Sequence, residues 1–379
     1  MVTPPRELAW IAAPGVRPPP LDAAGEPCLL VHQARFHVGD TLWLTPLLRA
    51  IHRFFPKART TVVGPPVACD LLAGNPHAAE VVPYLPDHGG EGRRRVLGRL
   101  AGHRLDAALF AFARRPESRW LARALAAGGV PWRINLEYFD PSLDHRSVPS
   151  WLTHEGWCVW GTLPSPRMLL HALDPLLGAE RPAWTEDDRR VELDISPQVR
   201  RRADELLKAR GIAGEPFAVL APGGYSSRRW PAERFSHLAA RLAAELGLHV
   251  LIEGSPAEET LLAQVAVQAG TTAGRRIVAA ADPLEVFAAL LERARLLVAN
   301  DSAPIHLAEA AGTPTLYFAQ REKLVHSHPA GEACWALFDE IGNDPARITV
   351  EQALRATRAL FKACKTMMDA VPSGPQSSR

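Results

Sequence analysis

Short apolar segments, each followed by a polar turn and an amphipathic helix, occur in two series along this chain of 379 residues. The first series begins at residues 28–31 and ends near Gly129, and the second runs from residues 219–220 to residues 315–318. A strand that follows such a helix returns parallel to its predecessor, so each series predicts a parallel, doubly wound sheet. The chain is long enough for two domains of ~150 residues, and we therefore expect an α/β protein with two of these sheets.

The two series are separated by residues 140–190, where Pro, Trp, His and Asp are frequent and the periodicity is weak. Prolines also crowd the start of the chain, and a helical pattern over residues 350–364 predicts a terminal helix. The expected parts are a Pro-rich flexible leader at 1–26, an N-terminal Rossmann-like domain with a linker at 27–190, a C-terminal Rossmann-like domain at 191–345, and a terminal helix with its tail at 346–379.

The composition excludes several classes of protein. The chain has 43 Lys and Arg against 41 Asp and Glu, which argues against a dedicated nucleic-acid coat, and 47% of its residues are hydrophobic, as in globular proteins. No apolar run reaches the ~18 residues of a membrane-spanning helix, and residues 1–26 do not resemble a signal peptide. The five Cys form no C-x-x-C pair, so we expect no disulfide framework, no zinc site and a cytoplasmic location.

The first candidate site is the loop at residues 35–41, which connects the first strand to its helix. Gly39 permits a tight turn, and Asp40 lies at the predicted start of the helix, close to His37. Asp is also a favoured N-cap residue, so a capping role alone would explain its position. The loop lacks the G-x-G-x-x-G pattern of dinucleotide-binding folds.

The second candidate site is the segment 221–231, which again follows a strand and precedes a helix. Adjacent glycines, two hydroxyls and two guanidinium groups make a plausible phosphate-binding loop. The alternative is a solvated loop in which Trp230 is a packing anchor. The candidate donor-binding residues of this loop are Gly223, Gly224, Ser226, Ser227, Arg228 and Arg229.

The third candidate site is the segment 300–306, in which a strand, a polar turn and a helix follow one another directly. Asp301, Ser302 and Ala303 lie where free backbone amides at a helix start would bind an anion, and His306 lies one turn further on. A simple cap with a histidine satisfied inside its helix is the alternative. Because parallel strands end at one edge of their sheet, we expect this turn to converge with the loop at 221–231.

Weaker candidates lie outside these three segments. Glu258 could accept hydrogen bonds from ribose hydroxyls, or could be an ordinary first-turn glutamate. Arg93 and Arg94 could meet an anionic acceptor, although a solvated helix face is the more common role for such a run. The sequence has no D-x-D pair, no metal-ligand spacing and no G-x-S-x-G motif.

Together these segments resemble glycosyltransferase family 9, the bacterial ADP-heptose:lipopolysaccharide heptosyltransferases, over about residues 28–320. The resemblance rests on three motifs in the same order along the chain. They are Gly39-Asp40 with Thr45-Pro46-Leu47-Leu48-Arg49-Ala50, Pro222-Gly223 with Arg228-Arg229-Trp230-Pro231, and Asn300-Asp301-Ser302-Ala303-Pro304-Ile305-His306 with Gly312-Thr313-Pro314.

The resemblance implies a GT-B fold, in which two Rossmann-like doubly wound domains face a central cleft. It places the acceptor on the first domain, beside Gly39 and His37, and the donor mostly on the second, and it implies that the terminal helix packs back on the first domain. It also implies an inverting reaction without a bridging metal, in which Asp40 is the base. Arg228 stands where the family has a phosphate-binding Lys, and Ala303 stands where it usually has Gly.

We therefore expect an inverting, metal-independent glycosyltransferase that needs no cofactor. Its first candidate donor is ADP-heptose, and its expected acceptor is a lipopolysaccharide core or another bacterial glycan. We expect no nucleic-acid partner, and a location in the cytoplasm with peripheral contact at the inner membrane. Two alternatives remain: a nucleotide-sugar epimerase of similar two-domain shape, and a non-catalytic protein that binds nucleotide sugars in glycan assembly.

Overall fold

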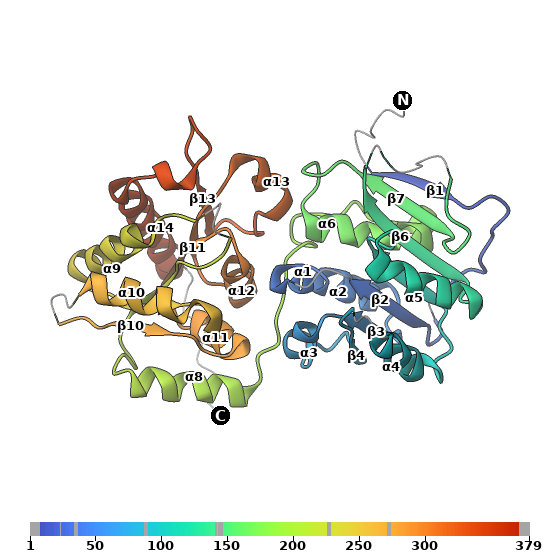
Figure 1. Ribbon diagram of the computed structural model, residues 1–379, viewed down its shortest axis with the longest axis horizontal. Helices are drawn as coiled ribbons and strands as arrows, with labels where there is room; N and C mark the ends of the chain where they lie inside the picture. The colour runs from blue at the N-terminus through green and yellow to red at the C-terminus, as the bar shows by residue number, and fades with distance from the viewer. Residues whose placement is uncertain are drawn as a thin grey trace. The chain divides into compact units, whose positions relative to one another are not determined.

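The computed structural model describes residues 8–22, 24–33, 37–86, 90–140, 142, 147–225, 229–270 and 274–370, with side chains up to residue 364. The chain divides into two compact units. The first unit comprises Met1–Asp194 and Glu322–Ala330, and the second comprises Ile195–Arg321 and Gly331–Arg379. Each unit contains one largely parallel sheet with helices on its faces, so the predicted pair of Rossmann-like α/β domains is confirmed (Figure 1).

The sheet of the first unit has the strand order β1-β7-β6-β5-β2-β3-β4. All neighbouring strands are parallel except β1, which pairs antiparallel with β7 at one edge. The chain order reverses direction between the adjacent strands β2 and β5, and this switch point is where doubly wound sheets bind ligands. The strands are β1 (Ala9–Ala12), β2 (Cys28–Gln33), β3 (Arg59–Gly64), β4 (Glu80–Pro83), β5 (Ala107–Ala111), β6 (Trp132–Tyr138) and β7 (His154–Cys158).

The sheet of the second unit has the order β10-β9-β8-β11-β12-β13 and is parallel throughout. This is the strand order 3-2-1-4-5-6 of a Rossmann sheet, with its switch point between β8 and β11. The strands are β8 (Phe217–Ala221), β9 (His249–Glu253), β10 (Ile277–Ala280), β11 (Leu296–Asn300), β12 (Thr315–Phe318) and β13 (Cys334–Leu337).

Helices cover both sheets. In the first unit they are α1 (Val38–Leu42), α2 (Thr45–Phe54), α3 (Pro66–Leu72), α4 (Glu91–Leu100), α5 (Pro116–Ala127), α6 (Ser165–Leu170), α7 (Asp174–Leu177) and α13 (Leu324–Ser327). In the second unit they are α8 (Pro197–Ala209), α9 (Ala232–Leu246), α10 (Glu259–Ala269), α11 (Leu284–Leu291), α12 (Ala303–Ala311) and α14 (Val350–Ala370).

Side-chain alternation along the strands builds the core of the second unit. Leu220, Ile252, Val298 and Phe318 face a buried apolar cluster that also contains residues of α9, α10 and α14. The intervening strand residues, such as Val219, point to the opposite face, where α11 packs against α8 and α12. Two fully covered faces explain why these strands are continuous apolar runs rather than alternating ones.

The N-terminal leader is more ordered than the sequence predicts. Within residues 1–26, β1 pairs with β7 along four residues, and the indole N–H of Trp132 donates to the carbonyl of Pro19 at 2.8 Å. The prolines therefore do not keep this whole segment flexible, because β1 contains none and Trp10 packs against the backbone at Gly156. Two further strands, β6 and β7, were not predicted, and β7 lies inside the expected linker.

The terminal helix also departs from the expectation that it packs back on the N-terminal domain. Ala353, Leu354 and Leu360 of α14 are buried in the same core as Leu238 of α9, within the second unit. The segment that groups with the first unit is instead Glu322–Ala330, which carries α13. The domain predicted over residues 191–345 is therefore interrupted by a short segment that belongs to the first unit.

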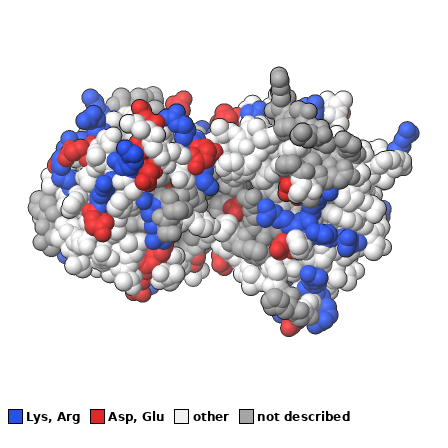
Figure 2. Space-filling model, turned by 45° about the horizontal axis from the view of Figure 1, so that its top comes forward, with Lys and Arg blue, Asp and Glu red and all other residues white. Residues whose placement is uncertain are grey.

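The surface carries charges of both signs. On the face of the molecule in Figure 2, basic and acidic side chains are interspersed, and neither sign covers a whole unit. This mixture follows from the near balance of charged residues in the sequence. In the part of the chain that the structure describes, no helix is long and apolar enough to span a membrane.

Candidate active site

Two backbone turns lie side by side at the switch point of the second sheet. One turn follows β8 at residues 222–225, and the other follows β11 and leads directly into α12. A Cβ atom added to Gly224 would lie 3.0 Å from the Cβ of Ser302, so the backbones of the two turns are in close contact. Gly224 has φ +106°, a conformation that side chains rarely adopt. The convergence predicted for these two segments is therefore confirmed by their geometry.

Asn300 holds the two turns together. This last residue of β11 is buried, and its amide donates to the carbonyls of Pro222 and Gly223 at 2.8 and 3.0 Å. Its side-chain oxygen accepts a hydrogen bond from the backbone N–H of Trp230 at 2.8 Å. One side chain thus satisfies three backbone groups of the neighbouring loop, which fixes both ends of the predicted phosphate-binding segment.

Glu258 closes the same site from the end of β9. One of its carboxylate oxygens accepts the N–H of Gly224 at 2.8 Å, and the other accepts the N–H and the hydroxyl of Ser255 at 3.0 and 2.8 Å. Glu258 is thus part of a capping box and also a brace for the glycine turn. A Cβ on Gly223 would lie 2.2 Å from this carboxylate, so a larger residue there would displace the Glu258 side chain.

The ionisation of Glu258 reflects these contacts. Burial disfavours its charged form, but hydrogen bonds from Ser255 and Gly224, together with the nearby Arg229, outweigh burial and lower the pKa of the carboxyl group. The side chain is therefore a negative hydrogen-bond acceptor at neutral pH, with one oxygen directed at the glycine turn and the other at Ser255. That arrangement suits the recognition of hydroxyl groups next to an anion site, since hydroxyls donate to carboxylates.

The start of α12 supplies the anion-binding geometry. Ser302 is the N-cap, Ala303 is the first helical residue, and Asp301 immediately precedes them with 7% of its surface exposed. His306 lies one turn into the helix, is 5% exposed, and has its Nδ1 atom 3.8 Å from a carboxylate oxygen of Glu309. A nine-residue helix that begins at the switch point directs its positive dipole end at this edge of the sheet, although Pro304 supplies no N–H and the N–H of Ile305 donates to the carbonyl of Ser302 at 3.2 Å.

The other predicted donor-binding residues divide into two groups. Arg229 donates from Nε to the carbonyl of Gly224 at 2.6 Å and lies 3.5 Å from Glu258, so this guanidinium braces the loop rather than extending away from it. Ser226, Ser227 and Arg228 lie outside the described residues, and their proposed contacts with a donor stay predictions.

A second carboxylate, Glu253, lies at the end of β9 and was not singled out from the sequence. It is completely buried, and Oε1 accepts the backbone N–H of Asp282 at 2.7 Å, while Oε2 has no hydrogen-bond partner among the residues that the structure describes. Asp282 is itself paired with Arg210 at 2.7 Å. Burial, with a smaller contribution from the Asp282 carboxylate, raises the pKa of Glu253 to about 9, although the Asp282 N–H and Arg210 oppose the rise.

This pKa predicts the direction of the pH dependence of stability. Folded Glu253 keeps its proton up to about pH 9, whereas unfolded Glu253 loses it near its ordinary value of 4.5. Between pH 4.5 and about pH 9 the folded state therefore holds one proton more than the unfolded state at this residue. The contribution of Glu253 to stability falls as the pH rises through this range. Glu253→Gln keeps a neutral side chain at every pH, so its melting temperature should exceed that of the parent protein increasingly between about pH 5 and about pH 9.

Thermal melts at several pH values measure this difference. Glu233→Gln, which removes an exposed carboxylate from α9, is the matched control. A melting-temperature difference between Glu253→Gln and the parent that is constant across the pH range would contradict the raised pKa.

In the first unit, the predicted Asp40 loop forms the short helix α1 at the switch point between β2 and β5. His37 is exposed and occupies the N-cap position, so Asp40 is the third helical residue rather than the cap. Gly39 is buried inside the helix, and its carbonyl accepts the N–H of Trp43 at 2.9 Å. The expected single helix after residue 41 is thus two helices, α1 and α2, and Asp40 is buried with 5% of its surface exposed.

The neighbouring turn after β5 carries a buried polar cluster that the sequence did not indicate. Arg114 donates from Nε to Glu155 at 2.9 Å, and Asn135 donates to the same carboxylate at 2.8 Å. Glu137 is 6% exposed, and within the described part of the chain its Oε2 atom has no hydrogen-bond partner. Burial raises the pKa of Glu137 to about 7, with Arg115 opposing the rise. Alternation along β6 could have shown that Asn135 and Glu137 share one face, but not that this face is buried.

Arg93 and Arg94 are exposed on α4, which follows β4. The guanidinium of Arg93 lies 5.6 Å from the centre of the Trp120 ring. Their assignment to the acceptor side stays a prediction.

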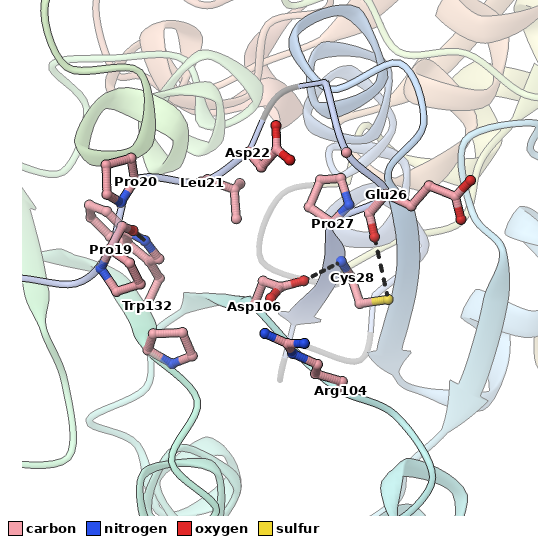
Figure 3. Close-up of a pocket in the computed structure, with 12 residues that line it drawn as sticks. Pro19, Pro20, Leu21, Asp22, Glu26, Pro27, Cys28, Arg104, Asp106 and Trp132 are labelled. Carbon is pink, nitrogen blue, oxygen red and sulfur yellow. Dashed lines mark hydrogen bonds between the residues drawn. The ribbon is translucent and has the colours of Figure 1, made fainter.

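A pocket of about 440 Å³ lies elsewhere in the first unit (Figure 3). It is lined by residues at the amino ends of the strands, including Cys28 of β2 and Trp132 of β6, and by Pro19 of the leader. Asp106, just before β5, accepts the N–H of Cys28 at 2.9 Å across its floor. Doubly wound sheets bind ligands at the carboxyl ends of their strands. This pocket lies at the amino ends of the strands of the first sheet, at the opposite edge of that sheet from Asp40.

Part of the chain is similar in sequence to a known protein family. Residues 179–333 match the model of glycosyltransferase family 9 (heptosyltransferase), which includes both turns, Glu258 and α12. No curated protein sequence matches the chain. The match confirms, over these residues, the resemblance indicated by the motifs, and it supports glycosyltransferase activity.

Three solved structures are similar to the chain. The first is a family 9 glycosyltransferase from Veillonella parvula (TM-score 0.73, 19% identity, 89% of this chain and 97% of that chain covered). The second is the E. coli ADP-heptose LPS heptosyltransferase II (TM-score 0.67, 20% identity, 89% and 99% covered). The third is the E. coli heptosyltransferase WaaC with ADP-2-deoxy-2-fluoro heptose (TM-score 0.60, 16% identity, 88% and 99% covered). The predicted GT-B fold class is confirmed by these similarities.

Proposed function

We propose that this chain, which matches glycosyltransferase family 9 over residues 179–333, transfers a sugar from a nucleoside diphosphate to a glycan acceptor. The observation that carries the proposal is the pair of turns at the β8–β11 switch point, held together by Asn300 and closed by Glu258. The turns bring a glycine backbone and the start of α12 to one place. A glycine backbone open to close approach, a positive helix end and a nearby carboxylate suit a diphosphate beside a ribose.

ADP-heptose is the proposed donor. The family match is to heptosyltransferases, and one similar structure is a heptosyltransferase with a fluorinated ADP-heptose. The diphosphate would lie against the amides at the start of α12 and against Arg228, with His306 one turn away. Glu258 would accept hydrogen bonds from the ribose hydroxyls. Each of these contacts stays a proposal about this chain.

The proposed reaction is a single displacement with inversion at the anomeric carbon. Asp40 removes the proton from an acceptor hydroxyl while that oxygen attacks, and the bond to the nucleoside diphosphate breaks on the opposite face. The positive end of α12, with Arg228, stabilises the charge that develops on the leaving diphosphate. We propose that no metal ion takes part, so the protein groups alone stabilise this charge.

The proposed acceptor is a lipopolysaccharide core or another bacterial glycan on the first unit. An acceptor carried on a lipid would bring the protein into peripheral contact with the cytoplasmic face of the inner membrane. The exposed Arg93 and Arg94 are the residues proposed to meet anionic groups of that acceptor.

The deciding experiment measures binding and transfer with a panel of ADP-, GDP-, UDP- and dTDP-sugars. We expect ADP-heptose to bind most tightly and to give a glycosylated product only when an acceptor glycan is present. A change in the sugar without an acceptor would support an epimerase. Binding without any reaction, with acceptors of several kinds, would support a non-catalytic nucleotide-sugar binding protein.

A further inference from the structure

An aromatic cluster lies at the carboxyl edge of the first sheet and was not indicated by the motifs. Tyr138 ends β6, Trp160 follows β7, and His326 belongs to α13. The ring centres of Trp160 and Tyr138 lie 5.0 and 5.7 Å from that of His326. Trp160 is 40% exposed, which is unusual for so large an apolar side chain, whereas His326 beneath it is 7% exposed.

Hydrogen bonds fix the orientation of the Tyr138 and His326 rings. The hydroxyl of Ser165 lies 3.0 Å from Nδ1 of His326, and the hydroxyl of Tyr138 lies 3.3 Å from the same nitrogen. Trp43 meets the His326 ring edge-on, with the ring centres 5.5 Å apart. Rings that are held from several sides lose little further freedom when a ligand binds against them.

The cluster adjoins the proposed base. Asp40 and Trp43 are three residues apart at α1, so their side chains leave the backbone on the same side, about one helical turn apart. Trp43 in turn contacts His326. A ligand ring on the exposed surface of the cluster would therefore lie within one or two side chains of Asp40.

Backbone strain marks the same place independently. Phe112, immediately after β5, has φ +66°, a conformation that costs a bulky residue of the order of 1–3 kcal/mol. Its ring lies 5.1 Å from that of Tyr138. Such strain tends to concentrate at functional sites, and here it positions one wall of the aromatic cluster.

We propose that the exposed ring of Trp160, supported by Tyr138 and His326, forms the platform on which the acceptor sugar ring stacks, with one hydroxyl directed to Asp40. The proposal rests on the proposed glycosyltransferase function. A pyranose ring has an apolar face of C–H groups and an edge of hydroxyls. The apolar face fits the exposed ring of Trp160, and the hydroxyl edge fits the polar groups of His326 and Tyr138. The Lys323 ammonium, 5.7 Å from the centre of the Trp160 ring, adds a cation at the rim.

The test replaces Trp160 with Ala and with Phe. Stacking of a ring on an aromatic side chain is worth ~0.5–1.5 kcal/mol, so we expect the acceptor KM of Trp160→Ala to rise about threefold to tenfold. Trp160→Phe should restore most of the loss. Donor affinity and melting temperature should change little in either variant, since the donor turns belong to the other unit. Trp335→Ala, at a partly buried Trp in β13 of the second unit, is the matched control.

A second measurement does not depend on turnover. Binding of a deacylated lipopolysaccharide oligosaccharide, followed by saturation-transfer NMR, should be weaker for Trp160→Ala than for the parent and Trp335→Ala proteins. An acceptor KM and oligosaccharide binding that are both unchanged in a folded Trp160→Ala protein would overturn the platform. If the parent binds the oligosaccharide through Trp160 but transfers no sugar from any donor, the platform stands and the proposed function fails.

Discussion

Replacement of Asp40 with Asn is expected to slow sugar transfer by ~10²–10⁴, the usual effect of removing a general base. Asn has almost the same shape, but it cannot accept the proton of the acceptor hydroxyl. The position itself strengthens this expectation. Asp40 is a buried carboxylate in the first turn of α1, at the switch point of the first sheet, where doubly wound sheets bind ligands.

The structural effect of Asp40→Asn should be small. Loss of one negative charge from the first turn of a helix reduces stability by ~0.3–1 kcal/mol, which would lower the melting temperature by only a few degrees. Donor affinity should be unchanged, because the donor turns belong to the second unit. Asp70→Asn, at an exposed position of α3, is the matched control for the loss of a charge.

Transfer rate, donor affinity and melting temperature should be measured on one preparation with a working acceptor. Near-normal transfer by well-folded Asp40→Asn would remove Asp40 from the mechanism. The search for the base would then return to His37, Asp301 and His306, which also lie at the carboxyl edges of the two sheets.

Replacement of Asn300 with Ala is expected to damage both stability and donor binding. The change leaves the carbonyls of Pro222 and Gly223 and the N–H of Trp230 without their side-chain partner. A buried polar group without a partner typically costs ~1–3 kcal/mol, so the free energy of unfolding should fall by roughly 3 kcal/mol or more. The glycine turn would also lose its fixed position beside α12, and donor affinity should fall at least about tenfold, equivalent to ~1.4 kcal/mol.

Two other variants check this account of Asn300. Asn300→Asp keeps the shape and the acceptor for Trp230 but sets a buried carboxylate oxygen against the carbonyls of Pro222 and Gly223, so it should lower both stability and donor affinity, as Asn300→Ala does. Asn75→Ala removes a buried asparagine of the first unit whose Oδ1 accepts the N–H of His77 at 2.9 Å, and it should leave donor affinity intact. Calorimetry of binding and denaturant unfolding give the two quantities. Unchanged donor affinity in folded Asn300→Ala would contradict the proposed role of the turn pair.

Much of the second unit could be predicted because its signals are local. The helices Ala232–Leu246 and Ala303–Ala311 have the predicted bounds, since each ends at a Gly with positive φ. The convergence of the two turns followed from parallel strands ending at one edge. What the sequence could not show is that Asn300 joins them, because its three partners lie 70 to 78 residues away in the chain.

The first unit was harder to predict because its structure also depends on contacts between residues that lie far apart in the chain. The strands β6 and β7 contain Asn135, Glu137 and Glu155, which are polar residues in buried positions, so their pattern does not read as a strand core. The segment Glu322–Ala330 belongs to this unit only through tertiary contacts, such as that of His326 with Ser165. Asp40 was expected at the start of the helix that follows β2, but its place inside α1 rather than at the cap depends on the backbone geometry.

We propose that the nucleotide sugar binds at the paired turns of the second unit. Hydrogen–deuterium exchange with and without ADP-heptose tests it most directly, because backbone amides at both turns are the proposed ligands. If the donor binds there, we expect ligand-dependent protection at residues 223–230 and 301–306, with smaller effects elsewhere. Protection confined to residues 28–130 of the first unit, with none at either turn, would contradict it.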